Sequence, residues 1–285
     1  MRSGGAGPAP TCTLRAGRAR ATVAPGHGCL IVDLDPGTGN VLWVDGRSPR
    51  MLESSALLGE ESAREFDEDV LLGGWFPMFP AAGLPTAGTQ QHGWAPRVAW
   101  TAVERTATRL VCTATGAFLN GGVAEVTRAI RLEPDALIVS STVRNAGDGM
   151  RFFTWGEHPC FSRDVFARGR AGFAGDEVAV PGDANGTAGH LCFSGTTASV
   201  TGPGVSLTLT DQAGTLPHWL LWYNYAADEL RRADTLAWEP STAAGLGIGD
   251  ALAEGAIQWL RPDQYFRTAI RCEWTLSTIF ATPVR

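Results

Sequence analysis

Three short stretches of the chain place a side chain that can carry a proton among aromatic and proline residues. His92 lies in "QQHGWAPRVAW", and His158 follows Glu157 in "FTWGEHPCFS". Glu239 follows Trp238 in "DTLAWEPSTAAGLG". Histidine exchanges a proton near neutral pH because its ordinary pKa is about 6.5. A carboxylate acts as a base when partial burial raises its pKa, so these residue types predict general acid–base chemistry.

Each stretch also has a structural explanation without chemistry. The first can be an aromatic-lined core loop with a hydrogen-bonded histidine, and His158 can be a core residue. Glu239 is followed by Pro240, which lacks the N–H that continues a strand ladder, so we expect Glu239 at a strand end. Strand ends are exposed, and they also commonly present functional groups. Aromatic faces beside polar donors favour a sugar as the ligand of the first loop.

Alternating apolar residues predict that strands position these side chains. In "CLIVDLD", Leu30, Val32 and Leu34 alternate, and we expect them on one face. "RVAWTAVERTATRLVCTATG" predicts two strands, and "VTRAIRLEPDALIVSSTVRNAG" predicts a hairpin around a Glu-Pro-Asp-Ala turn. Helical patterns are few and short. We therefore expect an all-β protein, a large antiparallel β-sandwich in a single domain over residues 21–285, after a flexible tail over residues 1–20.

Composition and spacing exclude several classes of function. The chain has no lysine, which removes Schiff-base chemistry, a pyridoxal-phosphate anchor and the lysine of a phosphate-binding loop. A net charge of −6 without a basic stripe argues against nucleic acid. The six cysteines form no C-x-x-C pair and the five histidines have no local ligand spacing, so we expect no metal site. No apolar run suits a membrane helix or a signal peptide, and we expect a cytoplasmic protein.

The order of five motifs resembles the aldose 1-epimerase (galactose mutarotase) superfamily. The motifs are "GCLIVDLDPGTGNVLWVDG", "FPMFPAAG" followed by "QHGWAPRVAW", "WGEHPCF", "LPHWLLWYNY" and "LAWEPST", and together they extend over most of the chain. The chain looks closest to the branch that includes the hexose-6-phosphate mutarotases. The resemblance implies the mutarotase supersandwich fold and a cofactor-independent isomerase that interconverts the α and β anomers of a free aldose.

The resemblance also implies a role for each proton carrier. Glu239 is the base at the anomeric hydroxyl, His158 is the acid at the ring oxygen, and His92 hydrogen-bonds and orients the sugar. The expected partner is a small sugar, with no metal or cofactor and with the protein a monomer or a weak homodimer. We expect further substrate contacts from six side chains: Trp75, Gln91, Trp94, Arg97, His218 and Trp222.

Strand periodicity separates the two neighbouring titratable residues of the second stretch. If residues 156–160 are extended, Glu157 and His158 point to opposite faces of their sheet. They therefore cannot enter one pocket as a catalytic pair. We expect His158 to face the site and Glu157 to meet solvent or an arginine on the back of the sheet.

Three departures from the family pattern bear on the substrate. Pro96 stands before Arg97, no arginine follows "FPAAG", and His218 in "LPHWLLW" stands where an aspartate is common. Phosphate recognition favours forked arginine donors, so we expect a neutral sugar, with a hexose-6-phosphate mutarotase as an alternative.

Two further functions stay open from the sequence. A non-catalytic sugar-binding sandwich would use Trp75, Trp94 and Trp222 as platforms. A glycoside hydrolase or lyase would need a second carboxylate about 5–10 Å from Glu239. The candidates for that carboxylate are Asp164 and Asp211.

Overall fold

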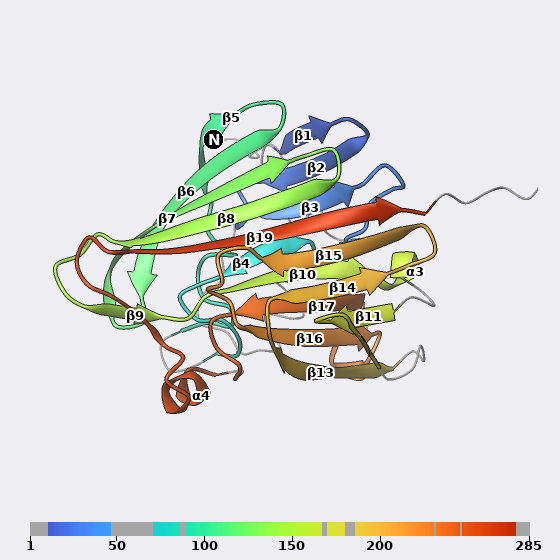
Figure 1. Cartoon of the computed structure of the whole chain (residues 1–285). Coiled ribbons are helices and arrows are strands. Elements are labelled where there is room, and N and C mark those ends of the chain that lie inside the picture. Colours follow the sequence, from blue (N-terminus) through green and yellow to red (C-terminus); the bar gives the residue numbers. More distant parts are fainter. Residues whose placement is uncertain are drawn as a thin grey trace, which may run out of the picture.

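Two large antiparallel sheets make up most of the computed structural model (Figure 1). The structure describes residues 11–46, 71–85, 89–166, 170–179, 186–230, 232–245 and 247–277. The all-β architecture is the one that the sequence predicts.

The first sheet has eight strands and carries the candidate site. In spatial order they are β1 (Cys12–Ala16), β2 (Ala19–Ala24), β3 (Leu30–Asp35), β4 (Trp75–Met78), β10 (Gly156–Ser162), β17 (Asp234–Ser241), β16 (His218–Tyr225) and β13 (Thr187–Ser194). Strands that are far apart in the sequence therefore lie side by side at its centre, where β4, β10 and β17 meet (Figure 1).

The second sheet has nine strands. In spatial order they are β12 (Asp176–Val178), β11 (Arg170–Phe173), β14 (Thr197–Thr201), β15 (Val205–Asp211), β19 (Tyr265–Leu276), β8 (Ala136–Asn145), β7 (Gly121–Leu132), β6 (Arg109–Phe118) and β5 (Thr101–Arg105). The strand pairs β5–β6 and β7–β8 confirm the two-strand and hairpin predictions.

The remaining elements are small. A two-stranded sheet pairs β18 (Gln258–Leu260) with β9 (Arg151–Phe153). The short helices are α3 (Arg163–Phe166), the 3-10 turn η2 (Asp228–Leu230) and α4 (Ile248–Ala253). Within the described ranges, no helix is long and apolar enough to cross a membrane.

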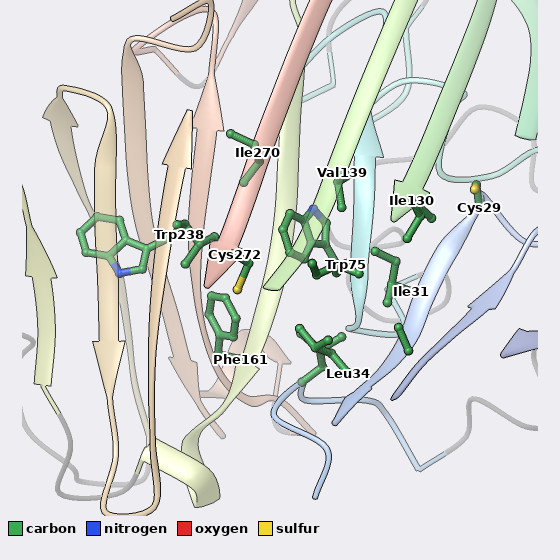
Figure 2. Close-up of a cluster of buried hydrophobic side chains, with 14 of the residues drawn as sticks. Cys29, Ile31, Leu34, Trp75, Ile130, Val139, Phe161, Trp238, Ile270 and Cys272 are labelled. Atoms are coloured by element: carbon green, nitrogen blue, oxygen red, sulfur yellow. The ribbon is translucent and has the colours of Figure 1, made fainter. Parts of the chain in front are cut away.

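The main hydrophobic core lies between the two sheets. Trp75 and Phe161 enter it from the first sheet, and Val139 and Ile270 enter it from the second (Figure 2). A smaller apolar cluster lies on the opposite face of the first sheet and includes Phe76, whose neighbour in β4 is Trp75. Successive residues of β4 thus belong to two different apolar clusters, one on each face of the sheet. Side chains alternate between buried and more exposed along strands such as β8, β15 and β19, whereas β4, β10 and β17 at the centre of the first sheet are buried on both faces.

The N-terminal boundary differs from the sequence prediction. Residues 12–20, expected in a flexible tail, form β1 and the start of β2, while residues 1–10 lie outside the described residues. Cys12, Leu14 and Ala16 alternate into the main core, and this burial holds the strand on the sheet.

Candidate active site

Glu157 and His158, consecutive residues near the start of β10, point in opposite directions, as the alternation predicts. Glu157 enters the main core, where its carboxylate accepts hydrogen bonds from the Trp75 indole at 2.9 Å and from the Arg128 guanidinium at 2.7 Å. It meets an arginine as expected, but only 1% of its surface is exposed, so it does not face solvent. The opposite face of β10 carries His158.

His158 and Glu239 oppose each other across two adjacent strands. Gly156 pairs with Ser241 and Cys160 pairs with Ala237, which sets His158 beside Glu239. His158 Nε2 lies 3.3 Å from Glu239 Oε1, and both side chains are buried. These two residues are 81 positions apart in the chain, and the register alone brings them together.

Glu239 lies within β17 and not at its end. The pairing of β17 with β16 continues past Glu239, because Pro240 opposes Trp219 and Ser241 opposes His218. The expectation that Pro240 ends the ladder is therefore wrong. The central position buries Glu239, which is 5% exposed.

His92 reaches the same place from a loop. Its backbone has a positive φ of 59°, and the next residue is Gly93, with a φ of 70°. A Cβ at Gly93 would lie 2.1 Å from the Phe79 carbonyl oxygen, so glycine is required where the loop meets β4. The His92 ring centroid is 5.3 Å from that of His158, and the Phe76 ring stacks on His158 at 4.6 Å.

These groups open into one cavity of about 210 Å³. Its polar lining residues are the buried Glu239, His158, His92 and Gln91 and the exposed His190. The other lining residues are Leu71, Gly83, Leu84, Leu220 and Trp222. The Trp222 ring meets the His158 ring edge-on at 5.7 Å. Ligand pockets commonly combine apolar walls with a few convergent polar groups, and this cavity has that composition.

Burial sets the protonation of both histidines. It lowers the pKa of His158 to about 3, so the imidazole is neutral at physiological pH although Glu239 is close. Burial also lowers the pKa of His92 well below 6.5, and the nearby His158 and Arg97 lower it further. The sequence-based expectation of a titration near 6.5 is therefore wrong for His158.

Solved structures resemble the whole chain. The Slr1438 protein from Synechocystis sp. PCC 6803 is 19% identical, with 97% of this chain and 99% of that chain covered, at a TM-score of 0.69. A candidate aldose 1-epimerase from Escherichia coli K12 is 17% identical, with 94% and 99% covered, at 0.69. A galactose mutarotase related enzyme from Lactobacillus acidophilus is 13% identical, with 93% and 97% covered, at 0.69. The chain has the galactose mutarotase-like fold. No family model and no curated protein sequence matches it.

On this galactose mutarotase-like scaffold, five of the nine predicted site residues line one cavity. They are Glu239, His158, His92, Gln91 and Trp222. The scaffold brings them together from β10, β16, β17 and the loop before Trp94, which explains why no single stretch of sequence contains the site.

The other four predicted site residues lie outside the cavity lining. Trp75 is fully buried in the main core, on the Glu157 side of the sheet (Figure 2). Trp94 packs against Phe79, and its indole donates to the Ala117 carbonyl at 2.8 Å. His218, at the start of β16, opposes Ser241, two positions beyond the Leu220–Glu239 pair.

Arg97, the fourth, hydrogen-bonds to the backbone of the loop that carries His92. Its guanidinium donates to the carbonyl oxygens of Gly93 at 2.9 Å and Gln91 at 2.8 Å. The side chain is 3% exposed, and these two hydrogen bonds go to the backbone of the loop. Arg97 therefore stabilises the loop that holds His92 in the cavity and does not itself line the cavity.

Sequence reasoning missed five cavity residues, and His190 is the one among them with a titratable side chain. It lies on β13 directly opposite Trp222 of β16. Because side chains opposite each other share a face, the pairing of these two strands would have revealed it, but no signal in the sequence fixes that pairing.

The described residues do not supply the chemistry of the hydrolase alternative. Glu239 is the one carboxylate among the described lining residues. Asp211 instead accepts hydrogen bonds from the backbone N–H groups of Ala213 and Leu216, and Asp164 lies in the first turn of α3. The described residues contain no cluster of three or more potential metal ligands.

Proposed function

We propose that the protein is an aldose 1-epimerase that interconverts the α and β anomers of a free aldose. The observation that carries the proposal is the 3.3 Å approach of His158 Nε2 to Glu239 Oε1, two buried side chains that line a cavity of about 210 Å³. Structural neighbours described as aldose 1-epimerase candidates or galactose mutarotase related enzymes support it at the level of the fold.

Mutarotation requires proton exchange at two oxygens that are bonded to the same carbon. The anomeric hydroxyl loses its proton as the bond between the anomeric carbon and the ring oxygen breaks, and the ring oxygen gains a proton. An acid and a base whose proton-exchanging atoms are neighbours can each contact one of the two oxygens. His158 Nε2 and Glu239 Oε1 have that arrangement. In the complex, contacts with the two oxygens replace the direct contact between these side chains.

Glu239 accepts the proton of the anomeric hydroxyl, and His158 donates from Nε2 to the ring oxygen. The carbonyl then rotates and the reverse transfers close the ring on its other face. His158 starts neutral because burial disfavours the imidazolium form. A neutral imidazole N–H is an effective electrophile toward an oxygen that gains negative charge as a bond breaks.

The other cavity residues hold and orient the sugar. Trp222 offers an aromatic edge and face beside His158, and Leu220 extends this apolar wall. His92 and Gln91 supply hydrogen-bonding groups on the other side of His158. This combination of aromatic and aliphatic surface with hydrogen-bonding groups suits a pyranose, which has C–H groups on its faces and hydroxyls at its edge.

The lining favours a neutral monosaccharide. None of the lining residues that the structure describes is an arginine, and Arg97 directs donors to two loop carbonyls. A phosphate on the sugar would enter a cavity whose described walls offer no guanidinium fork. We therefore expect free hexoses or pentoses to be better substrates than hexose 6-phosphates.

An NMR screen of anomer exchange over free hexoses, free pentoses and hexose 6-phosphates tests this function. We expect the enzyme to accelerate exchange of at least one free aldose. Binding of sugars without acceleration would instead identify a non-catalytic binding protein. A hexose 6-phosphate with tenfold higher kcat/KM than every free sugar would overturn the substrate class.

A further inference from the structure

A buried thiol lies directly behind the imidazole of His158. Cys160 is two residues further along β10, so both side chains project from the same face of the sheet. Cys160 Sγ lies 3.2 Å from His158 Nδ1, and the side chain is fully buried. The thiol therefore contacts the ring nitrogen that faces away from Glu239.

The backbone fixes the position of this sulfur. The Cys160 N–H donates to the Gly74 carbonyl at 2.8 Å, and the Cys160 carbonyl accepts from the Trp43 N–H at 2.8 Å. Hydrogen bonds on both sides hold the backbone of Cys160, and with it the Cβ atom that carries the sulfur, beside His158.

The partners of the imidazole determine which nitrogen carries the proton. A neutral imidazole has one N–H donor and one acceptor nitrogen. A Glu239 carboxylate can only accept, so the contact at 3.3 Å is favourable when Nε2 carries the hydrogen. Nδ1 is then the acceptor, and the Cys160 S–H is the donor in contact with it. The backbone of His158 itself also interacts with the imidazole and is a competing acceptor, so the tautomer measurement below decides between the two partners.

The protonation state of the thiol agrees with this direction, whereas its second neighbour, Thr235, is a competing acceptor because its hydroxyl donates to the Phe161 carbonyl at 2.8 Å. Burial raises the pKa of the Cys160 thiol well above its usual value, so the S–H is retained. The thiol also contacts Thr235. If the S–H pointed to Thr235, Nδ1 would carry the imidazole hydrogen, and the Nε2 lone pair would then oppose the Glu239 carboxylate.

We propose that Cys160 is a positioning residue: its thiol donates to Nδ1 of His158 and holds the imidazole in the tautomer that presents Nε2–H to Glu239 and to the ring oxygen of the sugar. The inference rests on the proposed function for its catalytic consequence. The tautomer itself is a property of the unliganded protein, so the two can be tested separately.

The test compares Cys160→Ala, Cys160→Ser and a matched control, Cys272→Ala. Cys272 is also fully buried, but it lies on β19 in the main core and does not line the cavity (Figure 2). The two readouts are the His158 tautomer and the anomer-exchange kinetics at matched folded fraction. Long-range ¹H–¹⁵N NMR spectra give the tautomer, with the signals assigned by their absence in His158→Asn.

The wild type is expected to show hydrogen on Nε2. Cys160→Ala should populate both tautomers and lower kcat by at least about tenfold with little change in KM, since tautomer control of a catalytic histidine can be worth up to about 10⁴-fold. Cys160→Ser should restore most of kcat, because a hydroxyl also donates to Nδ1. Cys272→Ala should alter stability without changing the tautomer.

Different outcomes overturn the inference and the proposed function. Hydrogen on Nδ1 in an active wild type, or a Cys160→Ala variant with unchanged tautomer and kcat, would refute the positioning role and leave the function intact. A wild type that carries hydrogen on Nε2 but accelerates exchange of no aldose would refute the function and retain the contribution of Cys160 to the tautomer.

Discussion

Glu157 and His158 are consecutive in the chain, yet they belong to different parts of the protein. Glu157 is hydrogen-bonded to Arg128 inside the core, whereas His158 faces Glu239 in the cavity. The alternation of a single strand therefore places a buried ion pair directly behind the histidine that we propose as the proton donor. Substitutions at these two neighbouring positions should separate stability from catalysis.

His158→Asn should lose most activity. Asparagine can hydrogen-bond the ring oxygen but cannot deliver a proton to it, and loss of a general acid costs about 10²–10⁴-fold in kcat. Anomer exchange is measured by NMR at a folded fraction matched by circular dichroism. Activity above a tenth of the wild-type value would exclude His158 as the acid.

Glu157→Gln should retain most of its activity per folded molecule but lose stability. The substitution leaves the Arg128 charge without its carboxylate in a fully buried position. Breaking a buried ion pair on one side costs about 3–5 kcal/mol. Urea unfolding gives the loss, and replacing Arg128 with leucine in the same chain should recover part of it. A stable Glu157→Gln variant with no activity would mean that the strand faces are assigned the wrong way round.

The pH dependence of stability follows from the lowered histidine pKa values. The unfolded chain protonates His158 below about 6.5, whereas the fold holds it neutral down to about 3. His92 and His27 are shifted in the same direction by burial. The unfolded state therefore binds more protons in this window, and the free energy of unfolding decreases as the pH falls.

His158→Asn should make this acid dependence shallower. Each such histidine contributes up to about 1.4 kcal/mol per pH unit to the slope. The free energy of unfolding is compared between wild type and variant from pH 7 to pH 4. Identical slopes would contradict a neutral, buried His158.

Substitution of Trp222 should change KM, whereas substitution of Trp75 should change the melting temperature. Trp222→Ala should raise KM by roughly tenfold, which corresponds to about 1.4 kcal/mol of lost contact with the sugar. Trp75→Phe removes the indole donor to Glu157, so it should lower the melting temperature and leave KM unchanged. A Trp75→Phe variant with an increased KM and an unaltered melting temperature would place that side chain at the sugar after all.

Local patterns were sufficient to predict most strands, because alternation is visible within each segment. They failed in β3, where we expected Leu30, Val32 and Leu34 on one face. An irregular register opposite Thr22 and Val23 shifts the alternation, so Leu34 enters the main core while Leu30 joins the cluster on the other face. A bulge of this kind depends on the neighbouring strand and leaves no clear trace in the sequence.

The sequence predicts the candidate site best where the motif residues themselves line the cavity. His92, His158 and Glu239 converge as expected. Trp75 was assigned to the wrong face, although its neighbour Phe76, which stacks on His158, satisfies the same aromatic pattern. The roles of Arg97 and His190 depend on loop closure and strand order, which only the assembled fold determines.

The most direct test of the account compares anomer exchange in Glu239→Gln and in the control Glu254→Gln, whose side chain is exposed beside α4. Glutamine keeps the shape of Glu239 but cannot accept the proton of the anomeric hydroxyl. We predict that Glu239→Gln binds the preferred aldose with near wild-type affinity and loses about 10²–10⁴-fold in kcat, whereas the control retains full activity. A folded Glu239→Gln enzyme that exchanges anomers at more than a tenth of the wild-type rate would contradict the assignment of Glu239 as the base.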